Sequence, residues 1–166
     1  MADHSLLHEL KQKKPFPSAR EEAFVALLRT ADMLRWRGSE VLAPEDLSAT
    51  QFNVLRILRG AGEAGLPTLD IGARLVEQAP GITRHIDRLE ARGLVRRERV
   101  AKDRRQVLCH IEPAGLRLLE RLEGPVAEAT TAIFSGLKTG EIEALLASLA
   151  VIRRSCAATC PSLKKH

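Results

Sequence analysis

The chain has 166 residues, a hydrophobic content of 45% and a formal net charge of +5, which suffices for one domain or two small intertwined units. Its pI near 9.5 fits a nucleic-acid partner without requiring one. Aromatic residues make up only 3%, which argues against the base-stacking platforms of proteins that bind RNA or single strands. Because no apolar run could span a bilayer and the first residues lack a signal-peptide core, we expect a cytoplasmic protein without a membrane partner.

The N-terminal part of the chain is predicted to be a polar arm followed by one long helix. Residues 1–17 are polar and end in prolines, so we expect a loosely held arm. The spacing of apolar residues then predicts a helix over 18–42, with Ser18 as its N-cap and Glu21 as the capping-box partner. The apolar stripe of this helix consists of Phe24, Leu27, Leu28, Ala31 and Leu34.

Three shorter helices are expected in the centre of the chain. Ser48 and Gln51 form a second capping box, which predicts a helix start. Thr68 is expected to cap a short helix over 69–76. Pro80 is then expected at the first position of the next helix, where its missing N–H is tolerated. Two short helices joined by a tight turn are typical of a helix-turn-helix.

The helix that follows Pro80 is predicted to be amphipathic. Apolar residues recur at helical spacing and define a buried stripe of Ile82, Ile86 and Leu89. The same spacing turns charged residues to the opposite face, namely Arg84, Asp87 and Arg88. Asp87 is expected either to bond Arg88 or a neighbouring arginine, or to face solvent. Gly93 stands where a left-handed residue would end the helix.

A strongly basic hairpin is expected next. Residues 94–100 and 107–111 are rich in β-branched residues, which predicts two strands joined by a long charged link over 101–105. The basic residues of the region are Arg92, Arg96, Arg97, Arg99, Lys102, Arg104 and Arg105, against only Glu98 and Asp103. Exposed arginines followed by a basic ribbon suit a polyanion with a groove. The alternative is a solvated helix and hairpin without a partner. The like charges of Arg84 and Arg88, one turn apart, argue against it.

Two helices are predicted after the hairpin. Pro113 opens the first, which continues to Leu137 and which Gly124 and Pro125 can kink or interrupt. After a turn over 138–140, a terminal helix carries an apolar stripe of Ile142, Leu145, Leu146, Leu149 and Ile152. The first and last long helices thus carry apolar stripes. The small unit formed by the central helices and the hairpin cannot cover both stripes alone. Pairing with a second copy would bury them, so we expect a symmetric homodimer.

The expected fold is therefore mainly α with a small β-hairpin wing (α+β), a winged helix-turn-helix joined to a helical dimerisation domain. The expected divisions are a polar arm over 1–17, a helical dimerisation region over 18–43 and 112–160, and a winged helix-turn-helix DNA-binding domain over 44–111.

An ordered set of motifs runs along the chain. It comprises L-S-A-T-Q-F at 47–52, I-T-R at 82–84, D-R-L at 87–89, R-G-L-V at 92–95, D-R-R at 103–105 and P-A-G at 113–115. The set resembles the MarR family of winged helix-turn-helix transcriptional regulators over roughly residues 20–155. The resemblance implies a homodimer that reads a pseudo-palindromic site in double-stranded DNA. It also implies a repressor that a small aromatic or phenolic effector, or an oxidant, releases from DNA.

The resemblance assigns DNA contacts residue by residue. Arg84 is the first choice for a base edge, because a guanidinium fork can read guanine bidentately. Thr83 can instead contact a phosphate. For His85, a role as a surface histidine is favoured over a contact with DNA. Arg105 would enter the minor groove, with Asp103 holding it or the hairpin tip. The full set of expected DNA-binding residues is Thr68, Pro80, Gly81, Thr83, Arg84, His85, Arg88, Lys102, Asp103, Arg104 and Arg105.

Other chemistry is weakly signalled. Trp36 and Arg37 are a candidate ligand pocket, although packing is the favoured role of the tryptophan. The cysteines, Cys109, Cys156 and Cys160, are expected to be buried or idle, since no activating neighbour is evident. We expect no cofactor, no metal and no catalytic residue, because the sequence has neither a phosphate loop, a nucleophile elbow nor a zinc signature. A dimer that coats DNA without sequence preference, or an adaptor for a partner protein, is the alternative function.

Overall fold

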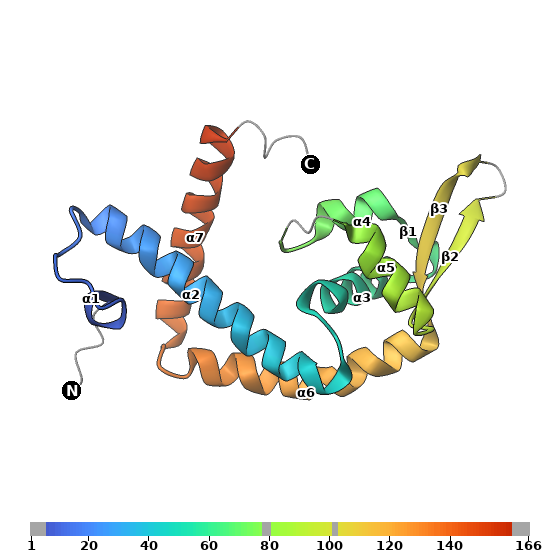
Figure 1. The fold of residues 1–166 in the computed structure, drawn as a ribbon, viewed down its shortest axis with the longest axis horizontal. Helices are drawn as coiled ribbons and strands as arrows, with labels where there is room; N and C mark the ends of the chain where they lie inside the picture. Colours follow the sequence, from blue (N-terminus) through green and yellow to red (C-terminus); the bar gives the residue numbers. More distant parts are fainter. Residues whose placement is uncertain (1–5, 78–80, 101–102, 161–166) are drawn as a thin grey trace. The chain divides into compact units, whose positions relative to one another are not determined.

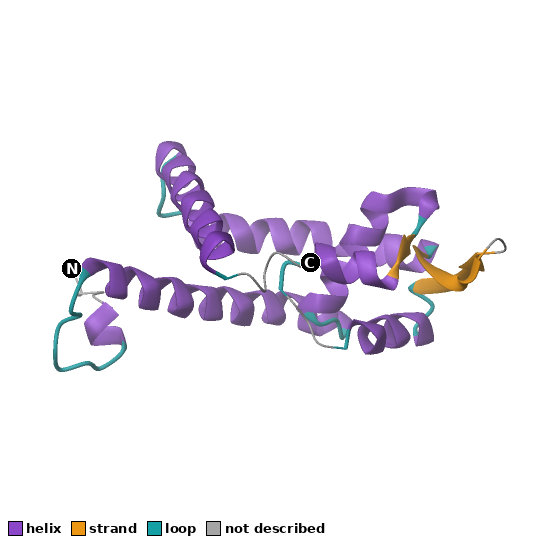
Figure 2. Cartoon of the chain, turned by 90° about the horizontal axis from the view of Figure 1, so that it is seen from above, coloured by secondary structure: helices purple, strands orange, loops and turns teal. Residues whose placement is uncertain are grey.

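The computed structural model describes residues 6–77, 81–100 and 103–160, with the backbone alone for 100 and 103–106. The chain divides into two compact units, Met1–Ala49 and Thr50–His166 (Figure 1). Most of the described residues are helical, and the strands form one small sheet (Figure 2). The expected fold class, mainly α with a small β-hairpin wing, is confirmed.

The first unit is built on one long helix. It contains α1 (Leu6–Glu9), α2 (Ala19–Leu42) and the 3-10 turn η1 (Ala43–Glu45). The predicted N-cap of α2 is confirmed, since the Ser18 hydroxyl oxygen accepts a hydrogen bond from the Glu21 amide at 3.3 Å. The predicted stripe of α2 stays largely open, with Phe24 64% and Leu28 56% exposed. A helix can hold such a stripe in water only at a cost, so this face is available to a partner.

The second unit holds the winged part of the chain and the two last long helices. Its elements are α3 (Ala49–Ala61), η2 (Gly62–Ala64), β1 (Leu66–Pro67), α4 (Thr68–Arg74), α5 (Ile82–Ala91), β2 (Val95–Val100), β3 (Asp103–Ile111), α6 (Pro113–Phe134) and α7 (Thr139–Thr159). The sheet is antiparallel with the order β1-β3-β2. Fully buried side chains from α3 to α6 and the sheet form the core, including Val54, Leu55, Leu58, Ile71, Ile86, Leu89, Val95, Cys109, Leu118 and Leu119.

Helix α5 forms and ends as the sequence predicts. Ile86 and Leu89 are 0% exposed, so the apolar stripe faces the core. Gly93 has φ +66°, a left-handed conformation that a glycine adopts without strain. The amide of Leu94 donates to the Leu89 carbonyl at 3.0 Å and that of Gly93 to the Glu90 carbonyl at 2.8 Å. These two bonds satisfy carbonyls at the helix end and fix the direction in which the hairpin leaves.

The predicted starts of α4 and α5 are wrong. Pro67 is the N-cap of α4 and Thr68 is its first helical residue, because the proline already supplies the extended cap conformation. Helix α4 also ends earlier than expected, at Arg74. Helix α5 begins at Ile82 after a left-handed Gly81 with φ +79°. Pro80, expected at the first helical position, lies outside the described residues.

The hairpin differs from its prediction at the tip. Strand β3 begins at Asp103 and pairs with Val100 of β2, so residues 103–105 belong to the strand and not to a long link over 101–105. The pairing shifts register between Arg99 and Val100, which inserts extra residues on β3. The sequence also gave no sign of β1, whose two residues, Leu66–Pro67, are too few for a periodic pattern.

Helix α6 is uninterrupted, but it ends at Phe134 and not at the predicted Leu137. Pro113 occupies its first turn, as predicted, but the helix runs through Pro125 without interruption to Phe134. A Cβ on Gly115 would lie 2.5 Å from the Leu94 carbonyl oxygen, so the absence of a side chain there lets α6 approach the start of β2. Helix α7 begins at Thr139, and only Lys138 of the predicted turn stands outside it.

Helix α7 buries no residue in the single chain. Its stripe is half-buried or exposed, with Leu146 58% and Ile152 41% exposed. Side chains of α6 and α7 enclose an apolar groove of about 630 Å³, lined by Thr130, Thr131, Phe134, Ser135, Leu137, Ile142, Leu145, Leu146 and Leu149. The predicted division into arm, dimerisation region and winged domain stays a prediction.

Candidate nucleic-acid interface

Helix α5 presents a polar face opposite its buried stripe. Thr83, Arg84, Asp87 and Arg88 are all exposed on it. Neither Arg84 nor Arg88 has an ion pair with another described residue. The two arginines stand one helical turn apart. Their charges therefore repel each other and are available to an anionic partner. The N-cap residue Gly81 has no side chain, and no acidic residue lies in the first turn. Among the described residues, the positive end of the helix dipole is therefore uncompensated.

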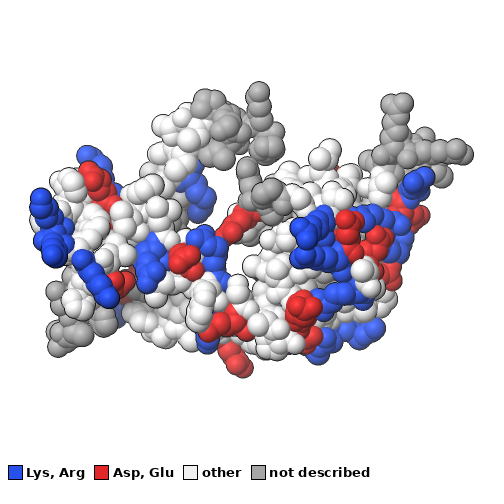
Figure 3. All heavy atoms as spheres, in the orientation of Figure 1, with Lys and Arg blue, Asp and Glu red and all other residues white. Residues whose placement is uncertain are grey.

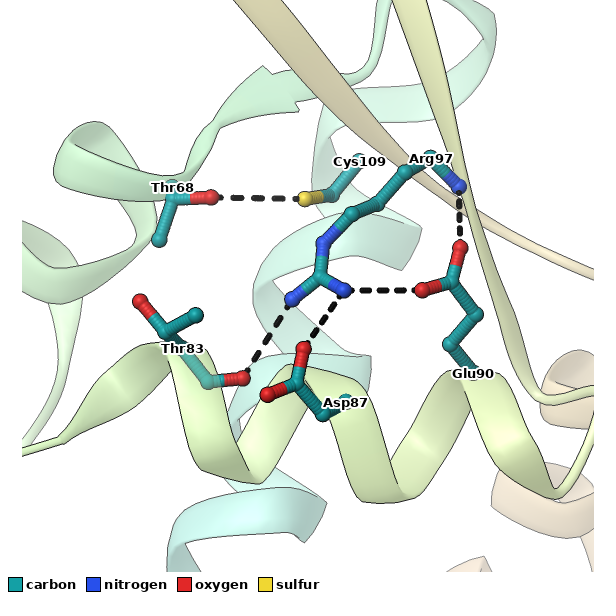
Figure 4. A network of polar contacts seen from close by, with 6 residues as sticks. All are labelled: Thr68, Thr83, Asp87, Glu90, Arg97 and Cys109. Atoms are coloured by element: carbon teal, nitrogen blue, oxygen red, sulfur yellow. Dashed lines mark hydrogen bonds and ion pairs between the residues drawn. The ribbon is translucent and has the colours of Figure 1, made fainter.

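Arg97 of β2 is held against this helix (Figure 4). Its guanidinium Nη1 lies 2.8 Å from Oε2 of Glu90 and 2.6 Å from Oδ1 of Asp87. Its Nη2 donates to the Thr83 carbonyl at 3.3 Å, and its backbone N–H donates to Oε1 of Glu90 at 3.0 Å. Asp87 thus pairs with an arginine of the hairpin and not with Arg88.

The environment of Arg97 favours its charged form. Burial opposes the charge, since only 22% of the side chain is exposed. The hydrogen bond and the charge of Asp87, followed by those of Glu90, outweigh burial and raise the pKa of Arg97 above its ordinary value. A partly buried, charge-assisted pair of this kind is stronger than an exposed one.

The neighbouring Arg96 points to other acids. Its Nε lies 3.0 Å from Oε1 of Glu112, and a second nitrogen contacts Glu98. The hydrogen bond from Arg96 is the first cause that lowers the pKa of the exposed Glu98 carboxyl. Acids outside the hairpin thus reach its arginines, in addition to Glu98 and Asp103 of the hairpin itself.

The face drawn in Figure 3 agrees with this arrangement. Over the elements labelled α4, α5, β2 and β3 in Figure 1, basic side chains alternate with acidic ones and do not form one unbroken patch. The charge available to a partner is then smaller than the count of lysines and arginines suggests. Arg99 is a described hairpin arginine that is exposed and has no ion pair with a described residue.

Two histidines near the candidate interface are partly or largely shielded from solvent. His85 is half-buried, and its Nδ1 is buried without a hydrogen-bond partner among the described residues; its predicted role as a surface histidine stays a prediction. His110 is 9% exposed, and its ring lies against Gly65, whose added Cβ would be 2.5 Å away. The His110 Nε2 lies 3.9 Å from Oε2 of Glu98.

The remaining expected DNA contacts are described unevenly. Thr68 is half-buried, and its hydroxyl lies 3.7 Å from the sulfur of the fully buried Cys109. Pro80 and Lys102 lie outside the described residues, and for 103–105 the structure describes the backbone only, within β3. Gly81 is exposed beside the start of α5. The set of DNA contacts as a whole stays a prediction.

The predicted ligand pocket on α2 also stays a prediction. Trp36 is 69% exposed, and Arg37 donates to Glu40 at 2.9 Å. A separate cavity of about 190 Å³ lies in the second unit, lined by Phe52, Arg56 and Arg59 of α3 and by Leu119, Glu123, Val126 and Ala127 of α6. Arg59 and Glu123 form an ion pair at 2.6 Å across it, and the Arg56 guanidinium lies 5.7 Å from the Phe52 ring centre.

The three cysteines differ in their exposure. Cys109 is buried, whereas Cys156 and Cys160 are exposed; all are free thiols. Among residues 6–77, 81–100 and 103–160, no three His, Cys, Asp or Glu side chains converge as a metal site. None of the helices described there combines the length and apolar character that a membrane crossing requires.

Sequence reasoning missed the contacts that join α5 to β2. Asp87 and Glu90 stand three residues apart, which places them on one side of a helix, and that spacing was the available signal. Their partner, Arg97, could not be identified without the packing of the hairpin against α5. Sequence charge counting instead grouped Arg97 with the arginines that face a polyanion.

Comparisons with known proteins agree on one family. The model of the MarR family matches residues 47–107. The HTH-type transcriptional regulator YkoM of Bacillus subtilis is 34% identical over 100 residues, which are 60% of this chain and 64% of that protein. This chain thus spans less than two thirds of the length of that relative.

Solved structures match over more of the chain. A MarR transcription factor from Planctomyces limnophilus is 39% identical with a TM-score of 0.65, covering 82% of this chain and 99% of that one. BpsR of Bordetella bronchiseptica, whose DNA binding is regulated by 6-hydroxynicotinic acid, is 27% identical with a TM-score of 0.72, covering 84% and 98%.

Proposed function

This chain belongs to the MarR family, and we propose that it is a sequence-specific regulator of transcription that binds double-stranded DNA. We further propose that it is a repressor and that a small-molecule ligand releases it from DNA. The observation that carries the proposal is the exposed face of α5, where Arg84 and Arg88 have no described ion-pair partner.

The geometry of α5 supports reading in the major groove, which admits an α-helix. The helix is fixed from beneath by Ile86 and Leu89, both 0% exposed. Its polar face stands clear of the core, and the uncapped N-terminus can accept a phosphate. Arg84, near that N-terminus, would read a base edge, while Thr83 and Arg88 contact a base or a phosphate beside it.

The protein would act as a homodimer. Helix α2 leaves Phe24, Leu28 and Trp36 exposed, and α7 leaves Leu146 and Ile152 exposed. A second copy would cover these apolar faces by symmetric contacts. Such a dimer reads a pseudo-palindromic site whose half-sites lie about 34–36 Å apart.

A small aromatic or phenolic acid is the proposed effector. The relative BpsR is regulated by 6-hydroxynicotinic acid, which is an aromatic carboxylic acid. In this chain, the cavity between α3 and α6 offers the Phe52 ring and the guanidinium of Arg56, while Arg59 is paired with Glu123. A ring and cationic donors suit an aromatic anion.

The first test compares DNA duplexes that the purified protein selects from a random-sequence library with unselected duplexes, over a series of salt concentrations. We expect strong preference for one pseudo-palindromic sequence. Arg84→Ala should cost about 1–3 kcal/mol and relax the preference at one position, whereas Lys102→Ala should weaken binding to all sequences alike. Equal losses on selected and unselected DNA for Arg84→Ala would contradict the assignment of base reading.

A protein that coats DNA would behave differently in the same experiment. Binding by phosphate contacts alone depends steeply on salt but discriminates little between sequences. Equal, salt-sensitive binding to both duplex pools would therefore replace the proposal by DNA coating. Absence of binding to either pool would favour an adaptor for a partner protein.

A further inference from the structure

Arg97 belongs to the hairpin, but the described contacts of its guanidinium are all with α5. Two carboxylates hold Nη1, those of Asp87 at 2.6 Å and Glu90 at 2.8 Å. The Thr83 carbonyl holds Nη2 at 3.3 Å. Figure 4 shows the guanidinium between strand and helix, with Asp87 beneath it and Thr83 and Glu90 to either side.

These contacts leave Arg97 poorly suited to bind a phosphate. One guanidinium faces two carboxylates, so the cluster of Arg97, Asp87 and Glu90 carries a net charge of −1 when all groups are ionised. The Arg97 side chain is only 22% exposed. A phosphate that approached it would meet the repulsion of the carboxylates before it gained a hydrogen bond. The role of Arg97 therefore lies within the protein.

The three partners of Arg97 span the recognition helix. Thr83 lies in the first turn of α5 and Glu90 in its last turn, with Asp87 between them. Their spacing of four and three residues places them along one side of the helix. The Arg97 backbone N–H also donates to Glu90 at 3.0 Å. Contacts at both ends of a short helix restrain its tilt and its rotation relative to β2.

The residues proposed to read DNA stand next to these partners. Arg84 follows Thr83, and Arg88 follows Asp87, directly in sequence. A rotation of α5 about its own axis moves both arginines together, and a misplacement of about 1 Å is enough to weaken a bidentate contact severely. Fixing the helix against the hairpin thus fixes the directions of Arg84 and Arg88.

We propose that Arg97 is a positioning residue that locks the recognition helix to the wing, so that α5 and the hairpin meet DNA as one rigid unit. The inference rests on the proposed function and names a residue that determines its specificity. Arg97 itself contacts no DNA. Its loss frees α5 to rotate, which harms the reading of a specific sequence and leaves attraction to phosphates in place.

The test measures affinity of the full chain for its selected duplex and for unselected duplex over a salt series. Arg97→Gln should lower affinity for the selected duplex by about tenfold or more, within the coupling range of residues in one salt-bridge network. Affinity for unselected duplex and the salt slope should stay unchanged. Arg96→Gln is the matched control, because Arg96 is the adjacent arginine and pairs with Glu98 and Glu112 instead. It should retain the wild-type preference.

Two results would overturn the proposal. Equal losses on both duplexes, with a salt slope reduced by about 0.9, would make Arg97 a phosphate contact. Wild-type affinity and preference in Arg97→Gln would make the network irrelevant to reading. Thermal unfolding is followed in parallel. If Arg97→Gln does not fold, Arg97→Lys is measured instead, because lysine keeps the charge but lacks the forked guanidinium. A wild-type preference for the selected duplex in Arg97→Lys would overturn the proposal. An intermediate preference would support it.

The wild-type measurement separates this inference from the proposed function. If the wild-type chain shows no sequence preference, the proposed function fails, and the positioning role fails with it. If the wild type prefers its selected duplex and Arg97→Gln does too, only the positioning role fails.

Discussion

The arginines of α5 and the hairpin differ in whether they are paired with carboxylates, and this pairing indicates the role of each. Arg97, with two carboxylates within 2.8 Å, serves the packing of hairpin and helix. Arg96, bound to Glu98 and Glu112, joins the hairpin to the start of α6. Arg84 and Arg88 have no such partner among the described residues, so their charge remains for a ligand. Exposed ion pairs stabilise a fold by only about 0–1 kcal/mol, so leaving arginines unpaired costs the fold little.

Helix α6 contains two glycines, Gly115 and Gly124, whose surroundings differ in the space that they leave for a side chain. A Cβ at Gly115 would lie 2.5 Å from the Leu94 carbonyl oxygen and 2.8 Å from Cγ1 of Ile111, whereas one at Gly124 would meet nothing within 4 Å. Gly115→Ala should therefore lower the free energy of unfolding by about 1–3 kcal/mol. Gly124→Ala should raise it by roughly 0.5–1 kcal/mol, because alanine favours the helix.

Urea unfolding at one fixed protein concentration measures both changes. The concentration must be fixed because association of copies would shift the apparent stability. Similar effects of the two substitutions would show that the close approach of α6 to β2 does not contribute to stability.

At the scale of elements, the sequence predicts what is periodic and misses what depends on packing. The core face of α5 follows from the spacing of Ile86 and Leu89, and its end from Gly93, which needs φ > 0. The starts of α4 and α5 were misplaced by one or two residues, since Thr68 and Pro80 are also compatible with neighbouring positions.

Features that join distant residues were beyond the reach of the sequence. Strand β1 exists because Leu66 and Pro67 pair with Cys109 and Leu108 of β3. The contact of Asp87 with Arg97 likewise requires the hairpin to fold back on α5. The exposed arginines of the candidate interface could be predicted, because they depend on the helical period alone. Its internal ion pairs could not.

Helix α6 contains two prolines in different positions, which allows a test at the same scale. Pro113 lies in the first turn, where no N–H bond is lost, while Pro125 lies inside the helix. Pro125→Ala should raise the free energy of unfolding by about 1–3 kcal/mol, because it restores a backbone hydrogen bond and removes a clash. Pro113→Ala should change it by less than about 0.5 kcal/mol.

Thermal and urea unfolding of the two variants, again at fixed protein concentration, measure the difference. A destabilised Pro125→Ala variant would contradict the expectation. It would indicate that the local geometry at Pro125 is matched to packing that alanine does not reproduce.

For the whole molecule, burial of side chains distinguishes the winged part and α6 from α7. The fully buried side chains come from α3 to α6 and the sheet, whereas α7 buries none. Exposed apolar side chains that line one groove mark an interaction site. The groove of about 630 Å³ between α6 and α7 belongs to the same surface. Assembly with a second copy is thus the expected completion of the fold.

Substitution on α7 tests this assembly. Leu146 is 58% exposed and lines the groove beside α6. Leu146→Glu should raise the dissociation constant of the proposed dimer by about tenfold or more, because a carboxylate without a partner is costly to bury in an interface. Ala144→Glu, about 160° around α7 from Leu146, is the matched control, because Ala144 is exposed and does not line the groove. It should leave the dimer intact. Analytical ultracentrifugation measures both, with circular dichroism to establish that α7 still forms.

Because each half-site would then be bound singly, Leu146→Glu should also lose affinity for the selected palindrome while it keeps affinity for one half-site. An unchanged dissociation constant in Leu146→Glu would remove α7 from the interface, and a monomeric wild type would remove the dimer altogether.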